Sequence, residues 1–72
     1  MTKAKNIKIT TEYITLGQFL KFASIIDQGG EAKGYLFTHE VKVDGVVEDR
    51  RGRKLRGGET VEAEGQTFLI VR

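Results

Sequence analysis

The sequence predicts an α+β fold in which two short helices pack on a small antiparallel sheet. Between residues 16 and 38, apolar side chains recur at the helical spacing of three and four. After residue 40 they alternate with polar ones, as in strands. The dipeptide Asp44-Gly45 between valine-containing segments is a strong signal for a tight β-hairpin. The length of 72 residues suits one domain, 1–72, with a small core.

The first helix is expected over residues 16–23. Thr15 and Gln18 have the spacing of a capping box, in which each side chain accepts a hydrogen bond from a backbone N–H of the other residue. Ile14 and Phe19 have the spacing of a hydrophobic staple across the same helix start. The residues around the helix start therefore favour the same boundary.

A second helix is expected over residues 30–38. Gly29 and Gly30 interrupt the chain before it. The apolar residues that follow at helical spacing are Ala32, Tyr35 and Leu36. We expect the helix to end at His39 with a positive φ, because histidine tolerates the left-handed conformation better than most residues.

The other elements are expected to be strands. Residues 6–10 alternate, with Ile7 and Ile9 on one side. Residues 41–47 read as a hairpin that turns at the Asp-Gly pair. A last hairpin is expected from strands 60–63 and 67–71, turning at residues 64–66.

Positive charge is concentrated in one segment. The chain carries 12 Lys and Arg against 10 Asp and Glu, yet five of the seven residues from 50 to 56 are cationic. These five are Arg50, Arg51, Arg53, Lys54 and Arg56. Leu55 is the only apolar residue that could anchor the segment in a core. The segment is either a solvated loop or a contact for a polyanion, and its arginines favour nucleic acid, because guanidinium groups bind phosphate oxygens bidentately.

The pair Gly29-Gly30 has two interpretations. Backbone amides at the start of a helix can bind an anion, and Lys33, one turn further, could add a full charge beside them. Alternatively, the glycines only form a tight turn and Lys33 is solvated. Both interpretations stay open.

The residue inventory opposes catalysis. The chain has no cysteine, one serine, Ser24, and one histidine, His39. Ser24 falls at the end of the first helix, where a polar residue is ordinary. A lone histidine is a poor metal site. We therefore expect no catalytic residues, no metal and no cofactor.

The sequence shows no targeting or membrane segment. The first ten residues contain lysines but no apolar run behind them, so no signal peptide is expected. No window approaches the roughly 18 apolar residues of a membrane span. We expect a cytoplasmic protein with no membrane partner.

Several motifs, in order and spacing, resemble the S-four domain, the RNA-binding domain named after small-subunit ribosomal protein four. The segment Val41-Lys42-Val43-Asp44-Gly45 is similar to its V-x-V-N-G, and Gly58-Glu59-Thr60-Val61 to its G-D-x-I/V. Matches to its two helices are Leu16, Phe19, Leu20 and Lys21, and the pair Ala32-Lys33. The resemblance covers about two-thirds of the chain, with a core at about 14–63 flanked by terminal strands. The RRGRKL run and the short length look most similar to the stand-alone YaaA/YbcJ-like branch.

The chain also departs from the family pattern. Gly29 stands where the family commonly has an arginine that faces RNA, and His39 stands where it usually has glycine. The second departure supports a left-handed helix end at His39. Asp44 replaces the usual asparagine of the turn, which is a conservative change.

The resemblance implies a non-catalytic module that binds structured RNA, with ribosomal or transfer RNA as candidates and the ribosome as a possible assembly. It implies one RNA-facing surface, which carries Lys21, Gly29, Gly30, Lys33, Arg50, Arg51, Arg53, Lys54 and Arg56. Phe19, Tyr35 and Phe68 are expected in the core, so recognition of shape and backbone is favoured over base stacking. We expect a monomer. The alternative is an adaptor whose basic loop docks on an acidic protein surface.

Overall fold

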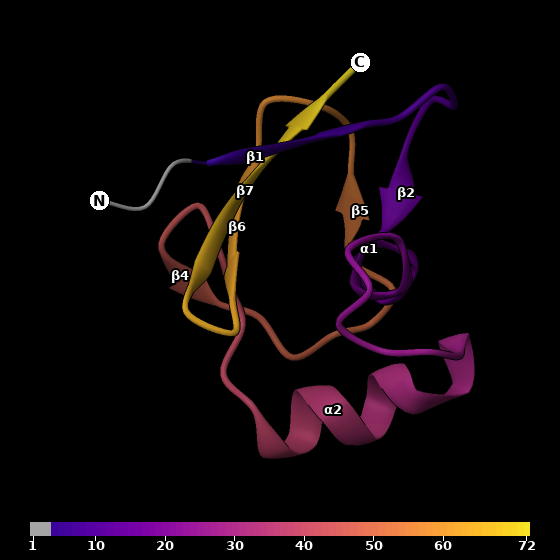
Figure 1. The fold of residues 1–72 in the computed structure, drawn as a ribbon, viewed down its shortest axis with the longest axis vertical. Coiled ribbons are helices and arrows are strands. Elements are labelled where there is room, and N and C mark those ends of the chain that lie inside the picture. Colours follow the sequence, from indigo (N-terminus) through magenta and orange to yellow (C-terminus); the bar gives the residue numbers. More distant parts are fainter. Residues whose placement is uncertain (1–3) are drawn as a thin grey trace.

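The computed structural model describes residues 4–72 and confirms the α+β class. In chain order the elements are β1 (Lys5–Lys8), β2 (Ile14–Thr15), α1 (Leu16–Phe22), the 3₁₀ helix η1 (Gly29–Glu31), α2 (Ala32–Thr38), β3 (Lys42–Val43), β4 (Val46–Val47), β5 (Lys54–Leu55), β6 (Thr60–Ala63) and β7 (Gln66–Val71). Five strands form one sheet in the order β1-β7-β6-β3-β4, and β2 pairs with β5 in a second sheet. Figure 1 shows α1 and the β2–β5 pair on one side of the molecule, the larger sheet on the other, and α2 along one end.

The larger sheet is mixed, which corrects the expectation of an antiparallel sheet. β1 runs parallel to β7, with Ile7 opposite Ile70, whereas all other strand pairs are antiparallel. A parallel pair needs a long connection, and here nearly the whole domain lies between the two strands. The alternation of Ile7 and Ile9 predicts a strand but not the direction of its neighbour. Ile9 is buried as expected, and Ile7 packs against the core from a partly exposed position.

Both hairpins turn at the expected places. Asp44 and Gly45 have φ values of 52° and 83°, and Glu64 and Gly65 have values of 53° and 69°. Two consecutive left-handed residues define the type I′ turn, whose twist matches the flanking strands. The second turn has two residues instead of the three expected, because β7 already begins at Gln66.

The core forms between α1 and the large sheet. Phe19 of α1 and Phe68 of β7 meet edge to face, with ring centroids 5.1 Å apart. The capping box is confirmed: the Gln18 amide donates to Thr15 Oγ1 at 3.2 Å, and the Thr15 amide donates to Gln18 Oε1 at 2.9 Å. The helix ends one residue before the expected boundary, and Ser24 takes the left-handed conformation just after it, with a φ of 60°.

His39 does not have a positive φ, so this prediction is wrong. Its backbone is extended, with φ −128° and ψ 144°. The imidazole lies flat on the ring of Tyr35, with centroids 4.2 Å apart and an interplanar angle of 3°. Stacking on Tyr35, rather than a special backbone conformation, accounts for histidine here. The second helix also differs at its start, where the first turn is the 3₁₀ helix η1.

Residues 4–72 contain neither a membrane-spanning helix nor a cluster of metal ligands. No helix combines the length and the apolar content needed to cross a bilayer. No three His, Cys, Asp or Glu side chains in this part of the chain gather closely enough to hold a metal ion.

Candidate nucleic-acid interface

Backbone hydrogen bonds fix the cationic segment to the start of α1. The Leu16 amide donates to the Arg53 carbonyl at 2.8 Å, and the Gly17 amide donates to the Arg51 carbonyl at 2.9 Å. The first amides of a helix have no partner within it, so an outside acceptor stabilises both partners. Leu55 is fully buried, as expected, and pairs with Ile14 between β5 and β2. The segment is therefore anchored at both its backbone and its one apolar side chain.

Gly17 makes this close contact possible. A Cβ built on Gly17 would lie 3.3 Å from the Ala32 Cβ and 3.4 Å from the Arg51 carbonyl oxygen. The first distance is tighter than most contacts of a Cβ, and the second is at the short limit of ordinary van der Waals contact, so α1, the start of α2 and the cationic segment meet at this glycine. The sequence contained a signal for it, since a glycine in the first turn of a helix is unfavourable without a packing reason.

A buried carboxylate organises the cationic segment from within. Glu48 is only 8% exposed. It accepts hydrogen bonds from the Arg50 amide, from Arg50 Nε at 3.0 Å and Nη2 at 3.1 Å, and from Arg53 Nη1 at 3.2 Å. The hydrogen bonds from Arg50 lower the pKa of Glu48 to about 2, although burial opposes this shift. The same pair raises the pKa of Arg50.

This arrangement divides the five cations of the segment. Arg50 and Arg53 form ion pairs with Glu48, so part of their positive charge is neutralised within the protein. Lys54 and Arg56 stand over the ring of Tyr13, with Nζ 5.0 Å and Cζ 5.6 Å from its centroid. Within residues 4–72, Arg51 has no ion pair. Neither Glu48 nor Tyr13 was predicted from the sequence, because neither lies inside the cationic run.

Arg56 has a second partner near the ring. Its Nη1 lies 3.7 Å from Glu12 Oε1, and both side chains are more than half exposed. An exposed pair at this distance contributes little to stability, so it leaves Arg56 available to another anion.

The residues Gly29 and Arg51 line one shallow hollow of about 340 Å³ together with Gly17 and Gly52. The start of η1 and the cationic segment therefore lie beside each other. The carboxylate of Glu31 already accepts the amides of Asp27 and Gln28, at 3.1 and 2.7 Å. This negative charge weakens the interpretation of Gly29-Gly30 as an anion site and supports that of a tight turn.

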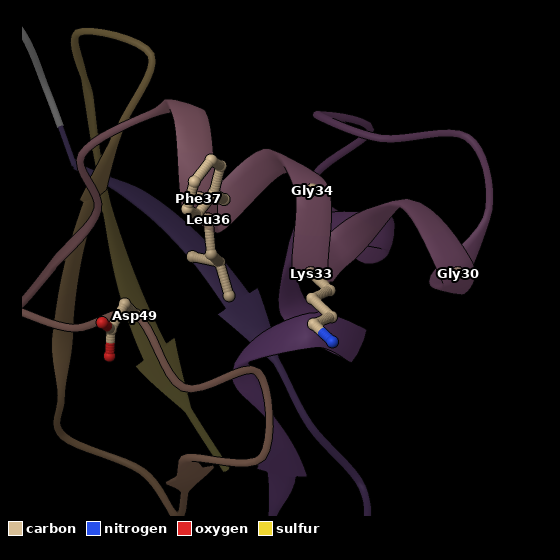
Figure 2. Close-up of a pocket in the computed structure, with 6 residues that line it drawn as sticks. All are labelled: Gly30, Lys33, Gly34, Leu36, Phe37 and Asp49. Atoms are coloured by element: carbon tan, nitrogen blue, oxygen red, sulfur yellow. The ribbon is translucent and has the colours of Figure 1, made fainter.

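Lys33 lies on α2 and lines a larger hollow of about 640 Å³ with Gly30, Gly34, Leu36, Phe37 and Asp49. Figure 2 shows Leu36 and Lys33 extending from α2 toward the chain segment that carries Asp49. Lys21 is exposed in the last turn of α1. No ion pair in the described part of the chain joins Lys21 to the cationic segment.

The aromatic residues differ from expectation in one respect. Phe19 and Phe68 are buried and Tyr35 packs against the core, as expected. Three other rings are exposed: Tyr13 at 38%, Phe22 at 65% and Phe37 at 89%. Exposed rings are therefore present that the expected core did not account for, while recognition of shape and backbone stays a prediction.

The fold and this site define a small α+β domain in which a cationic segment is attached to the start of α1. The chain belongs to the S4 domain family, the S-four family of ribosomal protein four, since the family model described as S4 domain matches residues 7–71. It is 56% identical over 69 residues to a Bacillus subtilis (strain 168) protein named "Probable ribosome maturation protein RlbA", covering 94% of this chain and 97% of that one. It is 34% identical over 59 residues to an Escherichia coli (strain K12) protein named "Putative RNA-binding protein YbcJ", covering 82% and 84%. A Shigella flexneri protein, named "Uncharacterized protein YbcJ", matches with the same identity and coverage.

Proposed function

We propose that this protein is a non-catalytic module that binds structured RNA, with ribosomal RNA as the first candidate. Membership of the S4 family supports RNA as the ligand, and the name of the Bacillus subtilis relative supports ribosomal RNA as the target. Such a target places the protein in the cytoplasm, where we expect it to act as a monomer.

The observation that carries the proposal is the attachment of the cationic segment to α1 by backbone hydrogen bonds. Two carbonyls of the segment cap α1, Leu55 is buried, and Glu48 holds Arg50 and Arg53. A solvated loop would not need these contacts. A prearranged set of cations loses less conformational entropy on binding, so more of its electrostatic attraction to phosphate appears as affinity.

In this proposal, the outward cations are those that form no ion pair with Glu48, and they bind phosphate groups of the RNA. Arg51 is the first of them, because it is exposed and has no ion pair within residues 4–72. The further contacts are Lys21, Lys33, Lys54 and Arg56, while Gly29 and Gly30 leave room for the RNA without binding a phosphate themselves. Arg50 and Arg53 act in two ways, since each supports the loop through Glu48 and keeps N–H donors that can face a phosphate.

The test is crosslinking in cells followed by sequencing of the bound RNA, with the Arg51→Ala variant as a matched control. We expect reads concentrated on structured ribosomal RNA, and their loss in the variant. Nuclease treatment of the purified protein separates the rival function. An adaptor for an acidic protein keeps its partner after nuclease treatment, and that result, with no enriched RNA, would refute the proposal.

A further inference from the structure

The hollow beside α2 combines a flat exposed ring with two opposite charges. Phe37 is 89% exposed, although an aromatic side chain is normally at least half covered. Lys33 lies one turn before it on α2, and Asp49, directly before the cationic segment, lines the hollow from another part of the chain. Neither Lys33 nor Asp49 forms an ion pair within residues 4–72. The charged groups are therefore open to a ligand.

Gly34 supplies an independent indication. It lies in the middle of α2 with ordinary helical backbone, and a Cβ built on it would meet no atom within 4 Å. Glycine weakens a helix interior relative to alanine, and nothing in the packing of this chain requires it here. Glycine at such a position is typical of a surface that a ligand approaches closely. A Cβ built on Gly30 would also meet no atom within 4 Å, so no side chain fills the hollow at these two glycines.

We propose that this hollow binds one unpaired nucleobase of the RNA, and that the base is guanine. This inference rests on the proposed function and names a further part of its site. Phe37 stacks on the base across the bare surface at Gly34, and Lys33 contacts an adjacent phosphate. Asp49 directly precedes Arg50 in the chain, so the hollow adjoins the cationic segment. An RNA strand whose phosphates contact the segment therefore passes the opening of the hollow.

The choice of guanine follows from the hydrogen-bonding groups. An ionised carboxylate only accepts hydrogen bonds, and its two oxygens accept side by side. The Watson–Crick edge of guanine offers two adjacent donors, the ring N–H and the amino group, which match the Asp49 carboxylate. Uracil offers a single ring N–H between two carbonyls that the carboxylate repels. Bases that leave the stack are read in this way, by stacking on one face and hydrogen bonding at one edge.

The experiment is an NMR titration of the full-length, isotope-labelled chain with guanosine 5′-monophosphate and, separately, with uridine 5′-monophosphate. We expect the guanosine nucleotide to shift the Phe37 ring and the Gly34 amide, and to bind several-fold more tightly than the uridine nucleotide. Phe37→Ala should weaken binding by about 5-fold to 100-fold, the range for loss of base stacking on an aromatic side chain. Asp49→Asn should reduce the preference for guanosine but keep the stacking.

Gly34→Gln is a variant that we expect to fold. Glutamine is a better helix former than glycine and meets open space, so the melting temperature should rise while nucleotide binding falls. The inference is overturned if neither nucleotide shifts the Phe37 ring, or if Gly34→Gln and Phe37→Ala bind like the wild type. Affinity of the same variants for total ribosomal RNA separates the two proposals. RNA binding that depends on Arg51 but not on Phe37 leaves the proposed function standing and removes only the base site.

Discussion

The Glu48 carboxylate links the stability of the fold to the cationic segment. Its pKa is lowered to about 2 from an ordinary value near 4.5. A group whose pKa is lower in the folded state stabilises that state above the ordinary pKa, and the contribution disappears as the pH falls toward the folded value. The contribution of Glu48 is therefore complete above about pH 4.5 and is lost between about pH 4.5 and 2.

Glu48→Gln should lower the free energy of unfolding at pH 7 by about 1 kcal/mol, because water partly screens its two partners, the exposed Arg50 and the half-buried Arg53. Denaturant titrations at pH 7 and near pH 3 measure it, and the variant should lose less stability on acidification than the wild type. Glu40→Gln, at an exposed position, is the control and should behave like the wild type. An equal loss on acidification in wild type and Glu48→Gln would mean that Glu48 is not the responsible carboxylate.

Replacement of His39 tests the role of its ring. His39→Gly should lower stability by about 1 kcal/mol, because it removes the stack on Tyr35 and adds backbone entropy to the unfolded chain. His39→Phe keeps a flat ring on an extended backbone and should lose less. Thermal melts decide the matter. A glycine variant as stable as the wild type would show that the stack contributes nothing.

The glycines of the two helices offer a matched pair. Gly34→Ala should stabilise the protein by about 0.5–1 kcal/mol, because the new methyl group meets open space in a helix interior. Gly17→Ala gains the same helix propensity but forces its methyl group against Ala32 and the Arg51 carbonyl. Because both neighbours are held by backbone, we expect a net loss of about 0.5–1 kcal/mol.

Denaturant midpoints compare the two variants directly. The loss at Gly17 should be accompanied by weaker RNA binding, since the contact also positions Arg51. Stabilisation by both substitutions would show that α1 and the cationic segment move apart easily and that their contact is loose.

Local signals predicted most of the elements. The capping residues Thr15 and Gln18 and the Asp44-Gly45 turn act within a few residues, so the sequence contains the whole interaction. The parallel pairing of β1 with β7 joins residues more than 60 positions apart, and no local pattern reports it. His39 is an exception among the local signals: the helix-end pattern predicts a left-handed backbone, but the backbone is extended and the imidazole stacks on Tyr35, four residues earlier.

The candidate site was predicted in part. Composition alone locates the cations of the segment from 50 to 56, and the buried Leu55 was foreseen as its anchor. The internal use of Arg50 and Arg53 by Glu48 depends on how the chain folds back, so counting charges overstates the cations available to RNA. Gly17, Tyr13 and Phe37 matter through contacts or exposure in three dimensions, which a residue count does not contain.

The domain depends on its terminal strands. β7 contributes Phe68 and Ile70 to the core and pairs with both β1 and β6. The division into a core at about 14–63 with flanking strands stays a prediction. A fragment of that core alone would lose the contact of Phe68 with Phe19 and Val61, so we expect it to be less stable than the full chain.

The salt dependence of RNA affinity tests the cationic interface most directly. If the five outward cations Lys21, Lys33, Arg51, Lys54 and Arg56 each meet one phosphate, log affinity should fall against log salt with a slope of about −4. Replacing Arg51 and Lys54 by alanine should make the slope about 1.5 shallower and weaken all structured RNAs similarly, with melting temperature almost unchanged. Lys8→Ala, on β1, is the matched control and should keep the wild-type slope. A double variant that binds purified ribosomal RNA with the wild-type affinity and slope would contradict the assignment of the cationic segment as the RNA contact.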